Sequence, residues 1–253
     1  MRRLRKRNIR VSGKSIKKST THNLLLAVMI ISILAGSGYA MSKVPKKDSN
    51  LASSVTRSIP DELDRDQFAS YIQTISGDYE NTKEAPVWEG QPLSFLPSEL
   101  DEKLDGVLGE SVTADDGSEK WIKISLADMK LWAMEGDRVV YEIPISSGRP
   151  GYPTVRGEFR VWRKTRYQRY LSRNPKNPYN LPNVPCSMFF KSGYAIHGAY
   201  WHNDFGIKNR SSGCVNVSVD NACLLYSWAG PDTAGKGSVN ASASNPGVRV
   251  VVY

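Results

Sequence analysis

Strand-like alternation begins at Trp121 and constrains the fold of the C-terminal half more than any other feature of the sequence. Apolar Ile122, Ile124 and Leu126 alternate with polar residues, the period of two that places apolar side chains on one face of a β-strand. Similar apolar segments follow at 131–133, 139–145, 157–162, 188–196 and 248–253. So many short strands predict a mostly antiparallel β domain over residues 119–253 rather than alternating βαβ units.

Turn and helix signals lie between these strands. Residues 135–137 (Glu-Gly-Asp) predict the turn of a β-hairpin, and residues 148–153 predict a loop because they are rich in Gly and Pro. Ser218 is a good N-cap for a short helix over 219–229. The predicted fold is therefore a mostly β domain, sandwich-like or barrel-like, with one or two short helices.

The N-terminus has the pattern of an export segment. Nine Lys or Arg residues and no acidic residue lie within residues 1–20, and an uncharged apolar segment occupies residues 24–40. A basic segment (residues 1–23) before an apolar one stays on the cytoplasmic side of a membrane. Two interpretations of 24–40 stay open, a cleaved signal peptide and a retained transmembrane anchor. Both predict that the rest of the chain lies outside the cytoplasm, membrane-anchored or secreted.

The formal charge of +9 is distributed unevenly. It is +9 over residues 1–20, −9 over 42–118 and +9 over 119–253. Membrane orientation explains the basic N-terminus, and a basic C-terminal surface would suit any polyanion, including the anionic polymers of a bacterial wall. The charge therefore gives no reason to predict a nucleic-acid partner.

Residues 41–118 are interpreted as an acidic, polar stalk. Prolines are scattered among short apolar patches, and no hydrophobic period is sustained. Helical spacing of apolar residues occurs around 61–76 and again around 97–108. Parts of the stalk are therefore expected to be helical and able to pack on the main domain.

The three cysteines are Cys186, Cys214 and Cys223, and an odd number in an exported protein leaves at least one thiol unpaired within the chain. Cys186 and Cys223 have apolar neighbours and are interpreted as small core residues, with a disulfide between them as the alternative. The Cys and His residues lack the short spacings of common zinc sites. No metal is therefore expected.

Cys214 is the residue best placed for chemistry. It follows small residues in the segment 210–216 (Arg-Ser-Ser-Gly-Cys-Val-Asn), where a tight turn can point consecutive backbone N–H groups at a reacting carbonyl. A cysteine nucleophile also needs a base, and His197 ends a predicted strand upstream. The pattern predicts nucleophilic catalysis by Cys214.

These residues resemble the L,D-transpeptidase catalytic domain of the YkuD type. That family pairs a histidine at a strand end with a Ser/Thr-x-Gly-Cys motif; here residues 194–198 read YAIHG, residues 211–214 read SSGC, and Cys214 follows His197 by 17 positions. The resemblance extends over residues 119–253. Many members have a histidine where this chain has Ser212.

The resemblance implies a role for each residue of the site. Cys214 would be the acylated thiolate and His197 the base, with the backbone oxygen of Gly198 orienting His197. The N–H groups of Gly213 and Cys214 would stabilise the oxyanion, and no cofactor would be needed. Residues expected to hold the nucleophile loop or to contact substrate are Ser211, Ser212, Asn216, Tyr179 and His202.

The function implied is that of a peptidoglycan L,D-transpeptidase in a bacterial cell envelope. It would form a thioester with the third residue of a tetrapeptide stem, release D-Ala, and transfer the acyl group to an amine; carbapenem β-lactams would be inhibitors. Two alternatives stay open, an L,D-carboxypeptidase that uses the same thioester and a catalytically inactive wall-binding module. A papain-like protease is disfavoured because its cysteine precedes its histidine in sequence.

Overall fold

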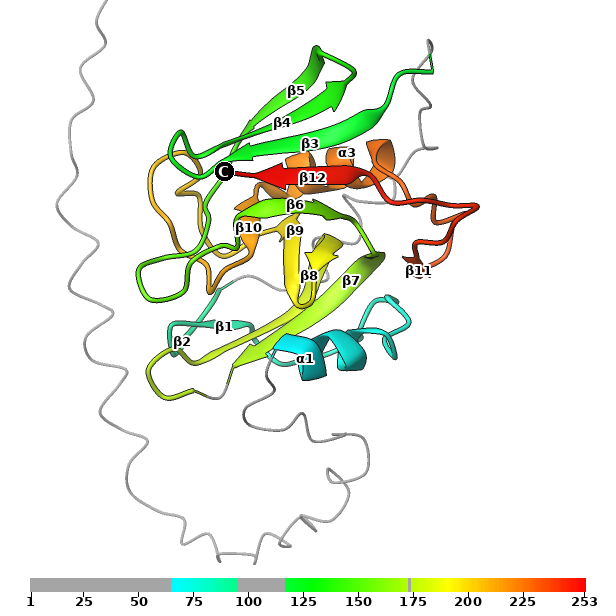
Figure 1. Ribbon diagram of the computed structural model, residues 1–253. Coiled ribbons are helices and arrows are strands. Elements are labelled where there is room, and N and C mark those ends of the chain that lie inside the picture. Colours follow the sequence, from blue (N-terminus) through cyan, green and yellow to red (C-terminus); the bar gives the residue numbers. More distant parts are fainter. Residues whose placement is uncertain (1–64, 95–116, 173) are drawn as a thin grey trace, which may run out of the picture. The chain divides into compact units, whose positions relative to one another are not determined.

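Two β-sheets form the part of the chain that the computed structural model describes, residues 65–94, 117–172 and 174–253 (Figure 1). The first sheet has the strand order β5-β4-β3-β12-β6. Its strands are β3 (Lys120–Ser125), β4 (Lys130–Glu135), β5 (Arg138–Pro144), β6 (Gly157–Arg160) and β12 (Arg249–Val252). The predicted hairpin joins β4 to β5, and the predicted C-terminal strand pairs with β3 in parallel.

The second sheet has the order β10-β9-β8-β1-β2, and β7 pairs with both β8 and β11. Its strands are β1 (Val87–Trp88), β2 (Gln91–Pro92), β7 (Arg163–Ser172), β8 (Tyr179–Lys191), β9 (Tyr194–Gly198), β10 (Val215–Val217) and β11 (Ser238–Asn240). Among the described strand pairs only β3–β12 and β9–β10 are parallel. The prediction of a mostly β, mostly antiparallel domain is confirmed.

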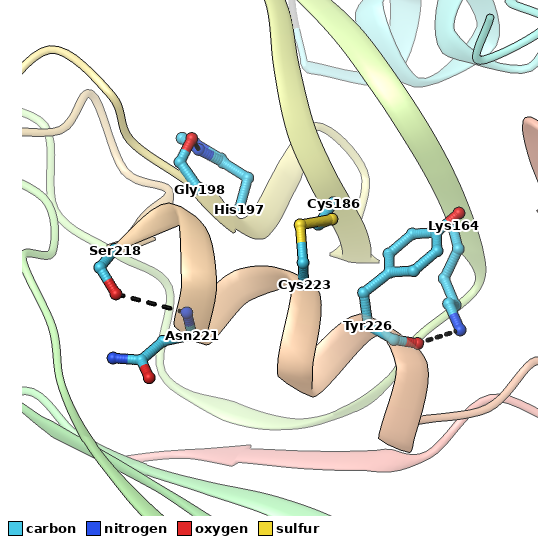
Figure 2. The surroundings of a disulfide bond; sticks show 8 residues. All are labelled: Lys164, Cys186, His197, Gly198, Ser218, Asn221, Cys223 and Tyr226. Carbon is cyan, nitrogen blue, oxygen red and sulfur yellow. Dashed lines mark hydrogen bonds between the residues drawn. A yellow bond between two sulfur atoms is a disulfide. The ribbon is translucent and has the colours of Figure 1, made fainter. Parts of the chain in front are cut away.

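Two helices are described, α1 (Arg65–Ile72) and α3 (Val219–Trp228). The Ser218 hydroxyl accepts a hydrogen bond from the N–H of Asn221, so Ser218 is the N-cap that the sequence predicts for α3. The other end of α3 is held by Lys164 of β7, whose Nζ donates to the carbonyl oxygen of Tyr226 at 2.6 Å (Figure 2) and to that of Ala229 at 2.7 Å. A cation is favourable at that end of a helix.

Strand β7 has no counterpart in the sequence-based prediction, because its basic residues interrupt the apolar alternation. Arg163 and Lys164 are nevertheless buried, and Arg163 donates to the carbonyl oxygen of Ile75 and to Asn240. The segment predicted as one strand at 188–196 is divided between β8 and β9 by a turn at residues 192–193. These differences arise from tertiary contacts. They give hydrogen-bond partners to buried charged groups that the sequence pattern would assign to the protein surface.

The residues upstream of the β domain pack on it between 65 and 94. Ile72 of α1 is fully buried against the second sheet, and β1 adds to that sheet beside β8. Glu80 and Asn183 exchange two hydrogen bonds, and Arg169 pairs with the carboxylate of Glu80 at 2.8 Å. Residues 65–94, expected to belong to the stalk, are therefore part of the folded unit. That unit begins upstream of residue 119.

Other predictions fall on parts of the chain outside the described residues. The basic segment 1–23, the apolar segment 24–40 and the helical pattern at 97–108 all lie there. Within the described residues no helix is long and apolar enough to cross a membrane.

Candidate active site

The cysteines differ in covalent state. Cys186 of β8 and Cys223 of α3 form a disulfide with 5.1 Å between their Cα atoms (Figure 2). This corrects the interpretation of both as unpaired core thiols, although both are fully buried. All three cysteines lie in the described residues, so Cys214 is the single free thiol of the chain, and it is partly exposed.

The parallel ladder between β9 and β10 positions the candidate residues. Val215 lies opposite Ile196, and Asn216 lies opposite His197. Val215 and Ile196 are fully buried in the main core. Because side chains alternate along a strand, Asn216 and His197 lie on the opposite face. Cys214, two residues before Asn216, packs against a second cluster that includes Tyr170 and is on that same face.

His197 is held as a neutral imidazole. Its Nδ1 lies 3.3 Å from the carbonyl oxygen of Gly198, the contact that the resemblance implies. A carbonyl can only accept, so Nδ1 carries the proton and Nε2 is the basic nitrogen. Burial lowers the pKa of His197 to about 4, since its side chain is 3 % exposed and lies 4.7 Å from the Tyr170 ring. At neutral pH this residue can accept a proton.

Gly198 lies in a tight slot, where a side chain would require its neighbours to move by a few tenths of an ångström. A Cβ there would lie 3.0 Å from Cγ of Pro185, 3.1 Å from Cα of Val219 and 3.4 Å from Cβ of Ala222. Pro185 precedes Cys186, and Ala222 precedes Cys223. The disulfide therefore joins the two walls of the slot that fixes the carbonyl facing His197 (Figure 2).

The loop of the predicted nucleophile, called the nucleophile loop below, is held by hydrogen bonds within and around it. Ser211 Oγ accepts from the N–H of Gly213 at 2.9 Å and donates to the carbonyl of Cys214 at 2.5 Å. Thr154 Oγ1 donates to the Gly213 carbonyl at 2.9 Å, and Gly213 has a φ of 118°, a conformation that favours glycine. The Gly213 N–H is thus hydrogen-bonded to Ser211 in this conformation, and its role as an oxyanion donor stays a prediction.

The thiol lies among polar and aromatic groups. Cys214 Sγ is 3.7 Å from the carbonyl oxygen of Gly193. Burial, and then the neighbouring Cys214, raise the pKa of the Tyr170 hydroxyl well above its usual value. Tyr170, whose ring lies beside that of His197, therefore keeps its proton.

The remaining predicted residues surround this centre. Ser212 Oγ accepts from Asn177 Nδ2 at 2.9 Å. The ring of Tyr179 lies 5.9 Å from that of Trp88, which lies 5.6 Å from that of Trp201. These three aromatic residues form a wall that reaches His197, 5.8 Å from the Trp201 ring.

His202 and Asn216 form a pair on the β10 side of the site. Nδ1 of His202 accepts the backbone N–H of Asp204 at 3.2 Å, and its Nε2 lies 3.0 Å from Nδ2 of Asn216. Burial lowers the pKa of His202 to about 4. No cluster of three or more metal-binding side chains occurs among the described residues.

Comparison with known proteins shows the family of this domain. The model of the L,D-transpeptidase catalytic domain, YkuD, matches residues 119–252. The chain belongs to the L,D-transpeptidase family. L,D-transpeptidase 1 of Mycobacterium tuberculosis is 34 % identical over 95 residues, which are 35 % of this chain and 38 % of that protein. The chain thus matches less than half of the length of this relative.

Solved structures of L,D-transpeptidases have lower sequence identity to this chain than that relative has over its matched segment. The complex of LdtMt1 with imipenem has 26 % identity and a TM-score of 0.45, covering 54 % of this chain and 60 % of that one. The enzyme from Xylanimonas cellulosilytica has 27 % identity and a TM-score of 0.37, covering 61 % and 69 %.

Several residues of the candidate site were not found from the sequence. Thr154 holds the nucleophile loop, Tyr170 stacks on His197, and Trp88 contributes to the wall from upstream of the family domain. A hydroxyl or an aromatic ring at these positions has no local signature, because its partners are distant in sequence. The one available signal was the YWH triplet at 200–202, which contains Trp201.

Proposed function

We propose that this chain is a peptidoglycan L,D-transpeptidase with Cys214 as its nucleophile. Its acyl donor would be a tetrapeptide stem, cut after the third residue, and its acceptor an amine of a second stem. The observation that carries the proposal is the single free thiol in an L,D-transpeptidase domain, on the ladder face that also presents a neutral histidine.

The proposed reaction has two half-steps with the same proton carrier. Nε2 of His197 takes the proton of the Cys214 thiol, and sulfur attacks the carbonyl of the third residue. The amide bond to the terminal D-Ala breaks, and the imidazolium returns the proton to the leaving amine. The acceptor amine then attacks the thioester, loses a proton to His197 and forms a new amide, while the C–S bond breaks.

β-Lactam inhibition follows from the same thioester chemistry. Solved relatives include a complex with imipenem, a faropenem-derived adduct and an enzyme acylated by ertapenem. We infer that Cys214 opens the β-lactam ring of a carbapenem and keeps the acyl group as a thioester.

Export of the catalytic domain belongs to the same proposal. Peptidoglycan stems are outside the cytoplasm, and the basic segment before residues 24–40 has the charge asymmetry that retains the N-terminus inside. We propose a domain that faces the cell wall, tethered by this segment or released after its cleavage. A reporter fused to the C-terminus should be active outside the cytoplasm; cytoplasmic reporter activity would contradict this topology.

The enzymatic proposal is tested with defined muropeptides and mass spectrometry. Incubating the full-length chain with a disaccharide-tetrapeptide and an amine acceptor should release D-Ala and yield the cross-linked product. Release of D-Ala with a tripeptide as the only product would instead identify a carboxypeptidase. No release, together with no carbapenem adduct on the folded protein, would identify an inactive module and overturn the proposal.

A further inference from the structure

The protonation of His202 follows from its two neighbours. The backbone N–H of Asp204 can only donate, so Nδ1 of His202, 3.2 Å away, must be the accepting nitrogen. A neutral imidazole has one N–H, which must then be on Nε2. The pKa of His202, lowered by burial to about 4, agrees with a neutral ring.

The Nε2–H of His202 determines how the Asn216 carboxamide is oriented. Nε2 lies 3.0 Å from Nδ2 of Asn216, which would place two donors against each other. The Asn216 Oδ1, in contrast, is buried and has no hydrogen-bond partner among the described residues. Rotating the carboxamide by 180° exchanges these atoms, so that Oδ1 accepts from His202 and the Nδ2 N–H groups occupy the unpartnered position.

We propose that His202 is a positioning residue, which turns the Asn216 carboxamide so that its N–H groups donate to a carbonyl oxygen of the acyl group on Cys214. Asn216 is then a further catalytic residue of the proposed transpeptidase. His202 acts only through Asn216. The Asn216 carboxamide therefore presents its N–H donors, and not its Oδ1 acceptor, to the bound peptide.

The position of Asn216 supports this role. It lies opposite His197 in the ladder and two residues after Cys214, about 7 Å along the strand. Because Asn216 and His197 are paired across the ladder, a group that reaches one from Cys214 is next to the other. The N–H of Gly213 is hydrogen-bonded to Ser211, and the carboxamide would supply a side-chain donor in addition to the expected Cys214 N–H.

The loop that carries His202 is itself fixed. Nε of Arg210 donates to Oδ2 of Asp204 at 2.7 Å, and Asp204 supplies the N–H that selects the tautomer. The His202 ring also contacts the rings of Phe205 and Trp201, at 4.9 and 6.0 Å. Any test must therefore separate the hydrogen bond of His202 from its packing.

The tautomer is measured directly on the wild-type chain. Nitrogen-15 NMR of the histidine side chains, assigned by a His202→Gln variant, should show a neutral His202 protonated at Nε2 and unprotonated at Nδ1. Protonation at Nδ1 would overturn the proposal. This measurement needs no catalytic activity, so it holds whether or not the proposed function is correct.

The functional test uses two variants that lose the same ring. Gln at 202 places an amide where Nε2 was and keeps the donor to Asn216, whereas Asn places one where Nδ1 was and loses that donor. We expect His202→Gln to acylate with a carbapenem within about threefold of wild type, and His202→Asn to be about 10- to 100-fold slower. Equal acylation rates in the two folded variants would show that His202 contributes only through packing, and would overturn the proposal.

A second background tests whether His202 acts through Asn216. In Asn216→Leu, which has no carboxamide, the difference between the two His202 variants should disappear. A difference that persists would place His202 in direct contact with the acyl group, contrary to the proposal. A wild-type chain that forms no adduct would refute the proposed function, while the tautomer would still decide how the Asn216 carboxamide is oriented.

Discussion

The two faces of the β9–β10 ladder are stabilised in different ways. On one face Ile196, Val215 and Val217 are fully buried in the main core, which also contains the Cys186–Cys223 disulfide. On the other face His197 and Asn216 are equally buried but polar, and Asn216 leaves one atom without a partner. Burying such groups is unfavourable. The apolar face and the disulfide must therefore provide the stability that holds the polar face in place.

Gly198 shows how the two faces are connected. Its carbonyl faces His197 on the polar side, while its Cα is enclosed by Pro185, Val219 and Ala222 from the disulfide-linked elements. Substitutions on the polar face should change the chemistry and leave stability nearly intact, whereas substitutions at the disulfide should do the reverse.

Replacing the nucleophile should have the largest effect. Cys214→Ala removes the only free thiol, so turnover and the carbapenem adduct should both disappear. The side chain is partly exposed, and its loss should leave the melting temperature nearly unchanged. Intact-mass spectrometry after carbapenem treatment measures the adduct. An adduct that persists in the folded variant would assign the nucleophile to another residue.

Replacing the base should have the next largest effect. His197→Gln leaves the thiol without a base, and an unassisted cysteine has a pKa of about 8.5. Acylation by a carbapenem at neutral pH should slow by about a hundredfold or more. Stopped-flow measurement gives the rate constant. A rate unchanged from wild type would show that His197 is not the base.

Removing the disulfide should mainly change stability. The bond closes a separation of 37 residues, for which the loss of chain entropy in the unfolded state predicts about 3–4 kcal/mol in the free energy of unfolding. Two packed thiols without a bond would predict only about 1 kcal/mol for each truncation, such as Cys223→Ala, and so about 2 kcal/mol for the double variant. Urea unfolding of Cys186→Ala/Cys223→Ala distinguishes these values. A loss near the smaller figure would indicate that the bond contributes little.

The smallest effect concerns the pH dependence of stability. The folded-state pKa of His197 is lowered to about 4, below its usual value of about 6.5, so folding favours the neutral ring. This contribution is fully present above pH 6.5 and is lost as the pH falls through about 4. The unfolding free energy of wild type should therefore fall relative to that of His197→Gln as the pH is lowered from 7 to 4. A constant difference would show that the ring is not buried in neutral form.

The sequence by itself determined the local features of this protein. The alternation from Trp121 predicted the strands of the first sheet, and Ser218 predicted the start of α3. The SSGC motif with its upstream histidine indicated the family. Each of these signals depends on neighbours in sequence, through side-chain alternation, capping or a tight turn. They can be recognised without knowing what lies across the sheet.

Only the tertiary structure decided which distant groups meet. It paired Cys186 with Cys223, placed the basic strand β7 inside the domain, and brought Trp88 to the wall of the site. It also showed that the Gly213 N–H donates to the Ser211 hydroxyl. The physical reason is that burial and hydrogen-bond satisfaction depend on the partners that folding brings together, and these partners are dozens of residues apart in the chain.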